Sequence, residues 1–233
     1  FLLYASLALS ATNHRDLSIR EIIQKSLRLS HPFQTHNFQR NMSLSTNVAI
    51  EVEGLTKRYG DLLAVNDVSF TVNRGEIFAF LGPNGAGKTM LFKALLNLIP
   101  HTGKIEWAGK VKKGYVPQNV TVSDIPISVK EFLSFKDHTD IEASLKPVKL
   151  DGKHVTNKSL GLLSGGQLRR VFIAWALADN PDVLLFDEPT TGVDLDSEEP
   201  IYATLDDLKR KKQITILLIT HDIHIVNEYS DYL

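Results

Sequence analysis

The chain has 233 residues, enough for one large or two small domains, and 43% of them are hydrophobic, which suits a protein with a full core. Its 26 lysines and arginines against 27 aspartates and glutamates give a formal net charge of −1, so charge does not favour nucleic acid or an anionic membrane surface as the main partner. Cysteine is absent, which excludes disulfides and thiol redox chemistry, and no run of about 20 apolar residues predicts a transmembrane helix.

The first 47 residues differ in amino-acid composition from the rest of the chain. Residues 12–47 are polar and rich in Asn, Gln, Ser, Thr and His. The sequence begins with Phe1, and Met42 offers an alternative start. We expect residues 1–47 to be an extension that is disordered or lies upstream of the true start, and we assign no function to residues 1–41.

Residues 48–118 are expected to be rich in strands. Residues 48–52 and 68–72 alternate between apolar and polar side chains, as half-buried strands do, and we expect them to pair as an antiparallel layer. Residues 55–60, between these two strands, are expected to form a turn segment. The other elements predicted here are strands at 77–81, 104–107 and 113–117 and a helix at 91–96.

Residues 119–165 are expected to form a small, mostly helical insert, with candidate helices at 128–135 and 141–145. After this insert, continuous apolar strands alternate with helices, which predicts a mainly parallel sheet covered on both faces and hence an α/β fold. Pro200 is expected in the first turn of its helix, where proline is tolerated. The elements predicted in this part are helices at 164–178 and 201–211 and buried strands at 183–186 and 214–219.

A glycine-rich segment at 82–89 stands between a predicted strand and a predicted helix. Its sequence, Gly-Pro-Asn-Gly-Ala-Gly-Lys-Thr, fits the pattern G-x-x-x-x-G-K-[ST], in which backbone N–H groups and a helix start surround a phosphate. Lys88 would reach the β- and γ-phosphates, and Thr89 would hold Mg²⁺ through its hydroxyl. The residues of this nucleotide-binding segment are Gly82, Pro83, Asn84, Gly85, Ala86, Gly87, Lys88 and Thr89.

Two adjacent carboxylates, Asp187 and Glu188, follow the buried strand predicted at 183–186. In open α/β sheets, ligands bind at the carboxyl ends of the strands, where these side chains are expected. Because neighbouring side chains at a strand end point in different directions, one carboxylate can serve Mg²⁺ and the other a water molecule.

A second helix start with exposed amides is predicted at 164–167. Ser164 is a typical capping residue, and Gly165 and Gly166 leave the backbone open to an anion. Because residues 82–89 already serve one triphosphate, this second start implies either a second ligand or a part in the site of another molecule.

These motifs, in this order, resemble those of the ATP-binding subunit of an ABC transporter over residues 48–233. The resemblance implies a P-loop NTPase core with a mainly parallel sheet, an antiparallel layer at its N-terminal side and a small helical insert. It also implies an ATPase that uses ATP and Mg²⁺. Because subunits of this family usually continue well beyond the equivalent of His221, we expect this chain to be truncated at its C-terminus.

The resemblance gives most motif residues a role in the chemistry. Tyr59 is expected to stack on adenine, and Met90, where a small hydroxyl residue is usual, to approach the α-phosphate only through its backbone. Asp187 becomes a magnesium ligand together with Thr89 and Gln118. The catalytic residues implied by the resemblance are the base Glu188, the switch histidine His221 and Lys88.

The resemblance also implies partners. In that family two copies sandwich two ATP molecules, and each phosphate loop is closed by the signature segment of the other copy, here Ser164, Gly165, Gly166 and Gln167. Asp194 would lie in the loop between the copies, and Gln118 in a loop that touches an integral-membrane permease. The chain would thus be cytoplasmic, peripheral on the cytoplasmic face of the cell membrane, with no nucleic acid as partner.

Residues 221–226 resemble the equivalent stretch of zinc, manganese and iron importer ATPases, which favours import of a divalent metal ion. Transporters of small organic compounds are the alternative cargo class. Other function classes are a non-transport ABC ATPase, which the single cassette without a basic arm disfavours, and an ATP-dependent regulatory module, which Glu188 and His221 disfavour. Trp175 stands where the family commonly has arginine and is expected to alter packing beneath the strand-end carboxylates.

Overall fold

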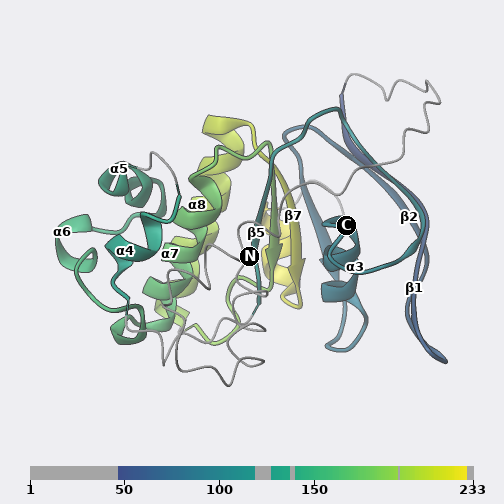
Figure 1. Ribbon diagram of the computed structural model, residues 1–233, viewed down its shortest axis with the longest axis horizontal. Helices are drawn as coiled ribbons and strands as arrows, with labels where there is room; N and C mark the ends of the chain where they lie inside the picture. Colours follow the sequence, from purple (N-terminus) through teal and green to yellow (C-terminus); the bar gives the residue numbers. More distant parts are fainter. Residues whose placement is uncertain (1–46, 119–126, 137–139, 194, 230–233) are drawn as a thin grey trace, which may run out of the picture. The chain divides into compact units, whose positions relative to one another are not determined.

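The computed structural model describes residues 47–118, 127–136, 140–193 and 195–229, and the structural statements below concern these residues. All of them belong to one of the two units into which the chain divides. The predicted N-terminal extension and Asp194 therefore lie outside the described residues, except for Asn47 at the end of that extension. Figure 1 shows two sheets, with the helices arranged around the parallel one.

The first sheet is antiparallel, in the order β2-β1-β4. It consists of β1 (Val48–Tyr59), β2 (Leu62–Asn73) and β4 (Thr102–Trp107). The predicted antiparallel pairing of the first two strands is confirmed. The turn predicted at 55–60 is wrong, because β1 continues to Tyr59 and pairs with β2 between Leu55 and Tyr59. Register shifts along this pairing, one of them next to the left-handed Gly54, let the irregular segment stay in the sheet.

The second sheet is parallel, in the order β3-β7-β6-β5. Every residue of its two inner strands is buried, which explains their continuous apolar sequences. Because all four strands run the same way, the segments that follow them meet at one edge of the sheet. The strands are β3 (Ile77–Leu81), β5 (Lys113–Val116), β6 (Val183–Asp187) and β7 (Thr215–Thr220).

Helices cover both faces of the parallel sheet, which confirms the predicted α/β fold. In Figure 1, α7 (Gly165–Leu177) and α8 (Leu195–Lys212) lie on one side, and α3 (Lys88–Leu95) with the antiparallel sheet lies on the other. A cluster of buried side chains from both sheets and α3 forms the core between them. Helix α9 (Ile223–Tyr229) follows β7 and was not predicted. No helix among the described residues is both long and apolar enough to cross a membrane.

Pro200 does not lie in the first turn of its helix, contrary to expectation. Helix α8 begins at Leu195, so the proline stands inside it. The proline ring removes one backbone donor but keeps a helical φ, and the helix continues through it. The carbonyl of Pro200 accepts a further hydrogen bond from the Thr204 hydroxyl at 2.8 Å.

Short helices fill the segment before α7. The helices predicted at 128–135 and 141–145 are confirmed as α4 (Val129–Leu133) and α5 (Ile141–Leu145), and α6 (Gly152–Val155) is added. Short 3₁₀ turns lie at Lys146–Val148 and Leu160–Leu162. Figure 1 shows these helices gathered beside α7.

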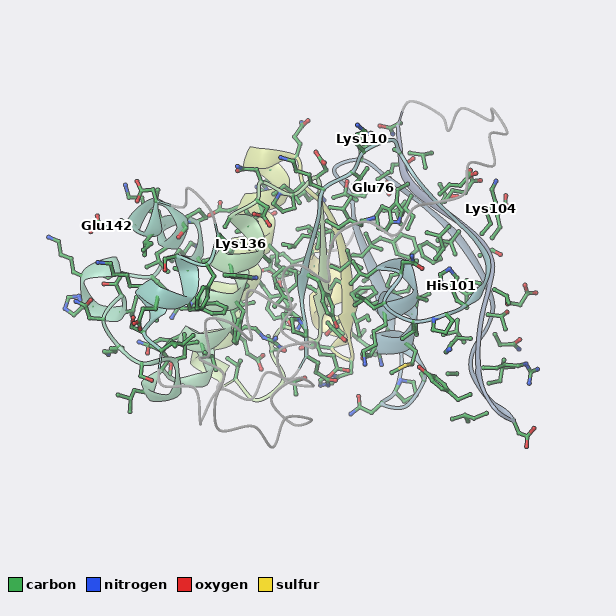
Figure 2. The ribbon with its side chains drawn as sticks, in the orientation of Figure 1. Glu76, His101, Lys104, Lys110, Lys136 and Glu142 are labelled. Carbon is green, nitrogen blue, oxygen red and sulfur yellow. The ribbon has the colours of Figure 1, made fainter. Side chains whose placement is uncertain are left out.

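Trp175 packs toward this helical segment. Its ring stacks on Phe132 with centroids 4.6 Å apart, and the Lys136 ammonium lies 4.7 Å from the ring centroid. Figure 2 labels Lys136, which also forms an ion pair with Asp179 at the end of α7. These contacts place the Trp175 ring between α7, which carries it, and α4. Its expected effect on packing beneath the strand-end carboxylates stays a prediction.

Candidate functional site

The glycine-rich segment joins β3 to α3 and ends in an open helix start. Gly87 stands before α3 in a left-handed conformation, and no side chain of the described residues caps the first turn. The first amides of the helix are thus available to an anion, as in phosphate-binding loops. Lys88 donates from Nζ to the carbonyl oxygens of Gly82 and Pro83, at 2.5 and 2.9 Å, which holds its ammonium against the loop.

Glycine is required at position 87 by the surrounding backbone. A Cβ atom at Gly87 would collide with the carbonyl oxygen of Ala64 on β2, and the φ of Gly87 is +85°. Gly85 has the same φ of +85°, but a Cβ atom there would have open space. The segment therefore depends on glycine for two different reasons, conformation at both positions and close approach at Gly87 alone.

Asp187 ends β6 and is fully buried. Its Oδ1 accepts a hydrogen bond from the Thr89 hydroxyl at 3.2 Å, and its Oδ2 accepts one from the Tyr115 hydroxyl at 3.3 Å. Burial raises the pKa of Asp187, and the two hydrogen bonds together with the nearby Arg169 charge act in the opposite direction. Thr89 and Asp187, predicted to share a metal ion, are thus brought together by contacts of their own.

Tyr115 is a neighbour of Asp187 that the sequence analysis missed. Burial and the Asp187 carboxylate raise the pKa of its hydroxyl far above the usual range, so it stays a hydrogen-bond donor. Tyr115 lies on β5 opposite Leu185 of the neighbouring strand β6, and its hydroxyl reaches the carboxylate of Asp187, two residues further along β6. The pattern of apolar and polar residues in β5 does not indicate that Tyr115 bonds to Asp187.

Glu188 has a left-handed backbone with a φ of 45°, which turns the chain out of β6. Its carboxylate is 6% exposed and accepts hydrogen bonds from Gln118 Nε2 at 2.6 Å and Thr191 Oγ1 at 2.8 Å. Lys88 Nζ lies 3.9 Å and His221 Nδ1 3.7 Å from its oxygens. The two adjacent carboxylates therefore have separate partners, and Gln118, Lys88 and His221 lie around the carboxylate of Glu188.

The parallel sheet explains why these residues meet. Lys88, His221, Glu188 and Gln118 follow β3, β7, β6 and β5, which are neighbours in that order. His221, Glu188 and Gln118 stand within two residues of the carboxyl ends of their strands, and Lys88 follows β3 at the end of the glycine-rich segment. The site is therefore the carboxyl edge of the sheet, where ligands of open α/β sheets bind.

The predicted adenine residue, Tyr59, lies at the end of β1 with 47% of its surface exposed. The Lys57 ammonium lies 4.3 Å from its ring centroid, and its hydroxyl contacts Met90 Sδ at 3.5 Å. The Met90 side chain, expected to matter only through its backbone, thus touches the aromatic residue next to the glycine-rich segment.

The second helix start, at α7, is closed by a reciprocal cap. Gln167 N donates to Ser164 Oγ at 3.2 Å, and Ser164 N donates to Gln167 Oε1 at 3.3 Å. Ser164 and Gly165 are exposed, and a Cβ atom at Gly165 would lie 2.8 Å from the carbonyl oxygen of Gly192. Within the described part of the chain, the side-chain hydrogen bonds of Ser164 and Gln167 stay inside this cap, away from residues 82–89.

Comparison with known proteins identifies the family. The family model described as ABC transporter matches residues 65–191. The zinc import ATP-binding protein ZnuC of Rickettsia conorii is 36% identical over 186 residues, which are 78% of this chain and 80% of that protein. ZnuC of Rickettsia bellii is 35% identical over the same shares. The chain belongs to the ABC transporter family.

Solved structures agree with this ABC assignment. CbiO1 of Clostridium perfringens, part of the ABC transporter complex cbiONQ, has a TM-score of 0.68 and 30% identity over 79% of this chain and 83% of that one. A dimeric structure of MJ0796, a bacterial ABC transporter cassette, has a TM-score of 0.66 and 27% identity over 79% and 94%. This ABC chain is accordingly an ATP-binding cassette and an ATPase, with the P-loop NTPase fold predicted from its sequence.

The arrangement can serve ATP hydrolysis in this ABC cassette. Phosphoryl transfer needs an anion cradle, positive charge, a metal site and a group that orients water. The open start of α3 with Lys88 meets the first two needs, and the two buried carboxylates meet the last two. Nothing in the described residues forms a cluster of three or more His, Cys, Asp or Glu side chains that could hold a metal ion alone.

Proposed function

We propose that two copies of this ABC ATPase combine on ATP binding and power a separate membrane permease that imports a divalent metal ion, with zinc as the first candidate. The similarity to ZnuC proteins, 36% identity over 80% of the Rickettsia conorii protein, supports a divalent metal ion as the cargo. The dimeric MJ0796 cassette supports the assembly. Attachment to the permease would place the chain at the cytoplasmic face of the membrane.

The proposed dimer rests on one observation, which is that the starts of α3 and α7 are built differently. The start of α3 is uncapped beside Lys88. The start of α7 is capped by its own Ser164 and Gln167, and its Ser164 and Gly165 are exposed while Gly166 is buried. A triphosphate held at α3 of one copy would be closed by Ser164, Gly165, Gly166 and Gln167 of the other. Asp194 would lie between the copies in this arrangement.

The residues proposed for Mg²⁺ fit a hard cation. Mg²⁺ prefers oxygen ligands and is usually held by one or two carboxylates together with substrate phosphates. The Thr89 hydroxyl, the Asp187 carboxylate and the Gln118 side-chain oxygen are ligands of this kind, and the first two are already joined by a hydrogen bond. Bound with ATP, the ion would neutralise charge that develops on the phosphates.

Glu188 is proposed to orient and deprotonate the attacking water. Its carboxylate is buried and accepts hydrogen bonds from Gln118 and Thr191, which fix its direction, and His221 Nδ1 lies 3.7 Å away. His221, 58% exposed, is proposed to contact the γ-phosphate, and Lys88 the β- and γ-phosphates. Tyr59 is proposed to stack on adenine, and the backbone around Met90 to contact the α-phosphate.

The dimer is tested by the concentration dependence of ATP turnover. The rate per subunit should rise with protein concentration, because each monomer holds half of the site. Phosphate release measured over a range of concentrations, together with sedimentation in the presence and absence of ATP, gives this dependence. A constant rate per subunit in a range where the protein sediments as a monomer would contradict the proposal.

The cargo is tested by metal uptake in cells. Removing this chain from the organism that encodes it should lower uptake of radioactive zinc and growth in a chelator, and restoring the chain should rescue both. A Glu188→Gln variant should fail to rescue, since it retains the fold but loses the base. Normal zinc uptake with reduced uptake of manganese or iron would replace zinc by that metal.

A further inference from the structure

Arg169, in the second turn of α7, is 5% exposed and has its guanidinium inside the protein. Nε donates to the carbonyl oxygen of Pro189 at 2.7 Å. Nη2 donates to the carbonyl oxygens of Glu188 at 2.6 Å and Gln118 at 3.1 Å, and Nη1 donates to that of Pro117. One side chain therefore satisfies four backbone acceptors.

The four acceptors come from two segments only. Pro117 and Gln118 follow β5, and Glu188 and Pro189 follow β6, its hydrogen-bonded neighbour in the parallel sheet. These segments carry the amide and the carboxylate that meet at 2.6 Å in the site. Arg169 thus links the backbones of the two segments whose side chains, Gln118 and Glu188, are hydrogen-bonded to each other.

The Arg169 guanidinium keeps its charge. Burial lowers its pKa to about 10, with Asp187, Tyr115, Tyr202 and Glu188 acting in the opposite direction, so the group is protonated at neutral pH. No carboxylate among the described residues accepts a hydrogen bond from it. Its hydrogen bonds to carbonyl oxygens are charge-assisted, which makes them stronger than neutral ones.

We propose that Arg169 is a positioning residue that sets the distance between Gln118 and Glu188 and fixes both to the helix that begins with the segment 164–167. The inference rests on the proposed function of Glu188 and Gln118. It goes beyond that function because Arg169 is buried and donates its hydrogen bonds to backbone carbonyl oxygens, so it would act through Gln118 and Glu188. A displacement of α7 would move both segments together.

Only arginine has the geometry for this function. A guanidinium presents five N–H donors in a rigid plane, and four of them would be engaged if each bond used its own hydrogen. Lysine retains the charge and the stem but presents three donors from one point, and glutamine presents two without charge. The Lys and Gln variants therefore both lose the planar set of donors, and only the Lys variant keeps the positive charge.

The experiment compares Arg169→Lys and Arg169→Gln with Arg210→Lys and Arg210→Gln in the full chain. Arg210 is an exposed arginine of α8 that pairs with Asp206, so its variants control for the same chemical changes at a surface position. Steady-state ATP hydrolysis gives kcat and KM, and binding of a fluorescent ATP analogue gives Kd. All rates are measured well below the melting temperature of each variant.

Both Arg169 variants should lower kcat by about 10- to 100-fold, because a small displacement of catalytic groups has an effect of this size. KM and the analogue Kd should stay within about twofold of wild type, since the start of α3 is untouched. The Arg210 variants should match wild type in all three. This division between kcat and binding is not expected from a general loss of stability.

Normal kcat in a folded Arg169→Lys variant would overturn the inference. Loss of folded protein in that variant would overturn it too, because the residue would then serve stability and not positioning. These failures are separate from failure of the proposed function. If wild type and both Arg210 variants hydrolysed no ATP, the ATPase assignment of the site would fail, whatever Arg169 does.

Discussion

The starts of α3 and α7 are both glycine-flanked helix N-termini, yet they are built in opposite ways. At α3 the backbone is left-handed at Gly87, no side chain of the described residues caps it, and Lys88 is held against the loop. At α7 the serine and glutamine of the segment 164–167 close the cap on each other, and the nearest basic residues, Arg169 and Arg170, face backbone carbonyls.

Under the proposed function, this difference assigns the phosphates to the start of α3 and the closing surface to the start of α7. An uncapped start with a cation can bind an anion without giving up existing bonds. A start that is already capped gains less from an anion, but it is rigid and exposed, which suits a surface that docks on a ligand held elsewhere. Under the proposed function, the two starts are two halves of one site, which a second copy would join.

The largest effect is expected for Glu188→Gln, which leaves both helix starts intact. ATP turnover should fall by about 10²- to 10⁴-fold, the usual contribution of a positioned acid–base group. Glutamine can still accept from Gln118 and Thr191, so ATP binding should be retained and the dimer should persist with bound ATP. Phosphate release and gel filtration with ATP measure the two outcomes. Near-normal turnover would remove Glu188 from its proposed role.

A smaller effect is expected for alanine at the two left-handed glycines before α3. Gly87→Ala should weaken binding of an ATP analogue by more than tenfold, since its Cβ would collide with Ala64 and the loop must shift. Gly85→Ala meets no neighbour and should cost only the strain of a left-handed backbone, about 1–2 kcal/mol. Titration of the analogue into both variants checks the order, and equal loss would mean that close approach to β2 is unimportant.

Ser164→Ala is expected to distinguish the functions of the two helix starts, because it should change turnover but not ATP binding by the monomer. It removes the α7 cap, while the uncapped start of α3 stays as it is. The analogue Kd measured at low protein concentration should therefore stay within about twofold, and turnover at high concentration should fall about tenfold. The same comparison run on monomer and dimer fractions tests whether α7 acts on another copy. A loss of monomer affinity equal to the loss of turnover would place α7 in its own chain's site.

Sequence periodicity predicted the parallel sheet and most helices, because buried strands and capped helices leave strong local patterns. The turn predicted at 55–60 was wrong because pairing with β2 and β4 keeps β1 in the sheet as far as Tyr59. The motif residues were placed by their order along the chain. Tyr115 and Arg169 were missed, because their partners lie at the ends of other strands and only the sheet order brings them together.

The smallest effect is expected for Ser128→Ala, which removes the same kind of cap from α4. Glu131 N donates to Ser128 Oγ at 3.2 Å, and Ser128 N donates to Glu131 Oε2 at 2.7 Å, so this start matches that of α7 in chemistry. Loss of the cap should lower the free energy of unfolding by about 1 kcal/mol and the melting temperature by about 2–4 °C.

Turnover of Ser128→Ala should equal that of wild type at every protein concentration, because α4 lies in the helical segment beside α7 and contributes no residue to the proposed site. Thermal melting and phosphate release on the same sample measure both. If Ser128→Ala lost turnover as Ser164→Ala does, capping would act on the enzyme through stability alone. This result would argue against a functional role of the α7 start, since removal of either cap would lower turnover equally.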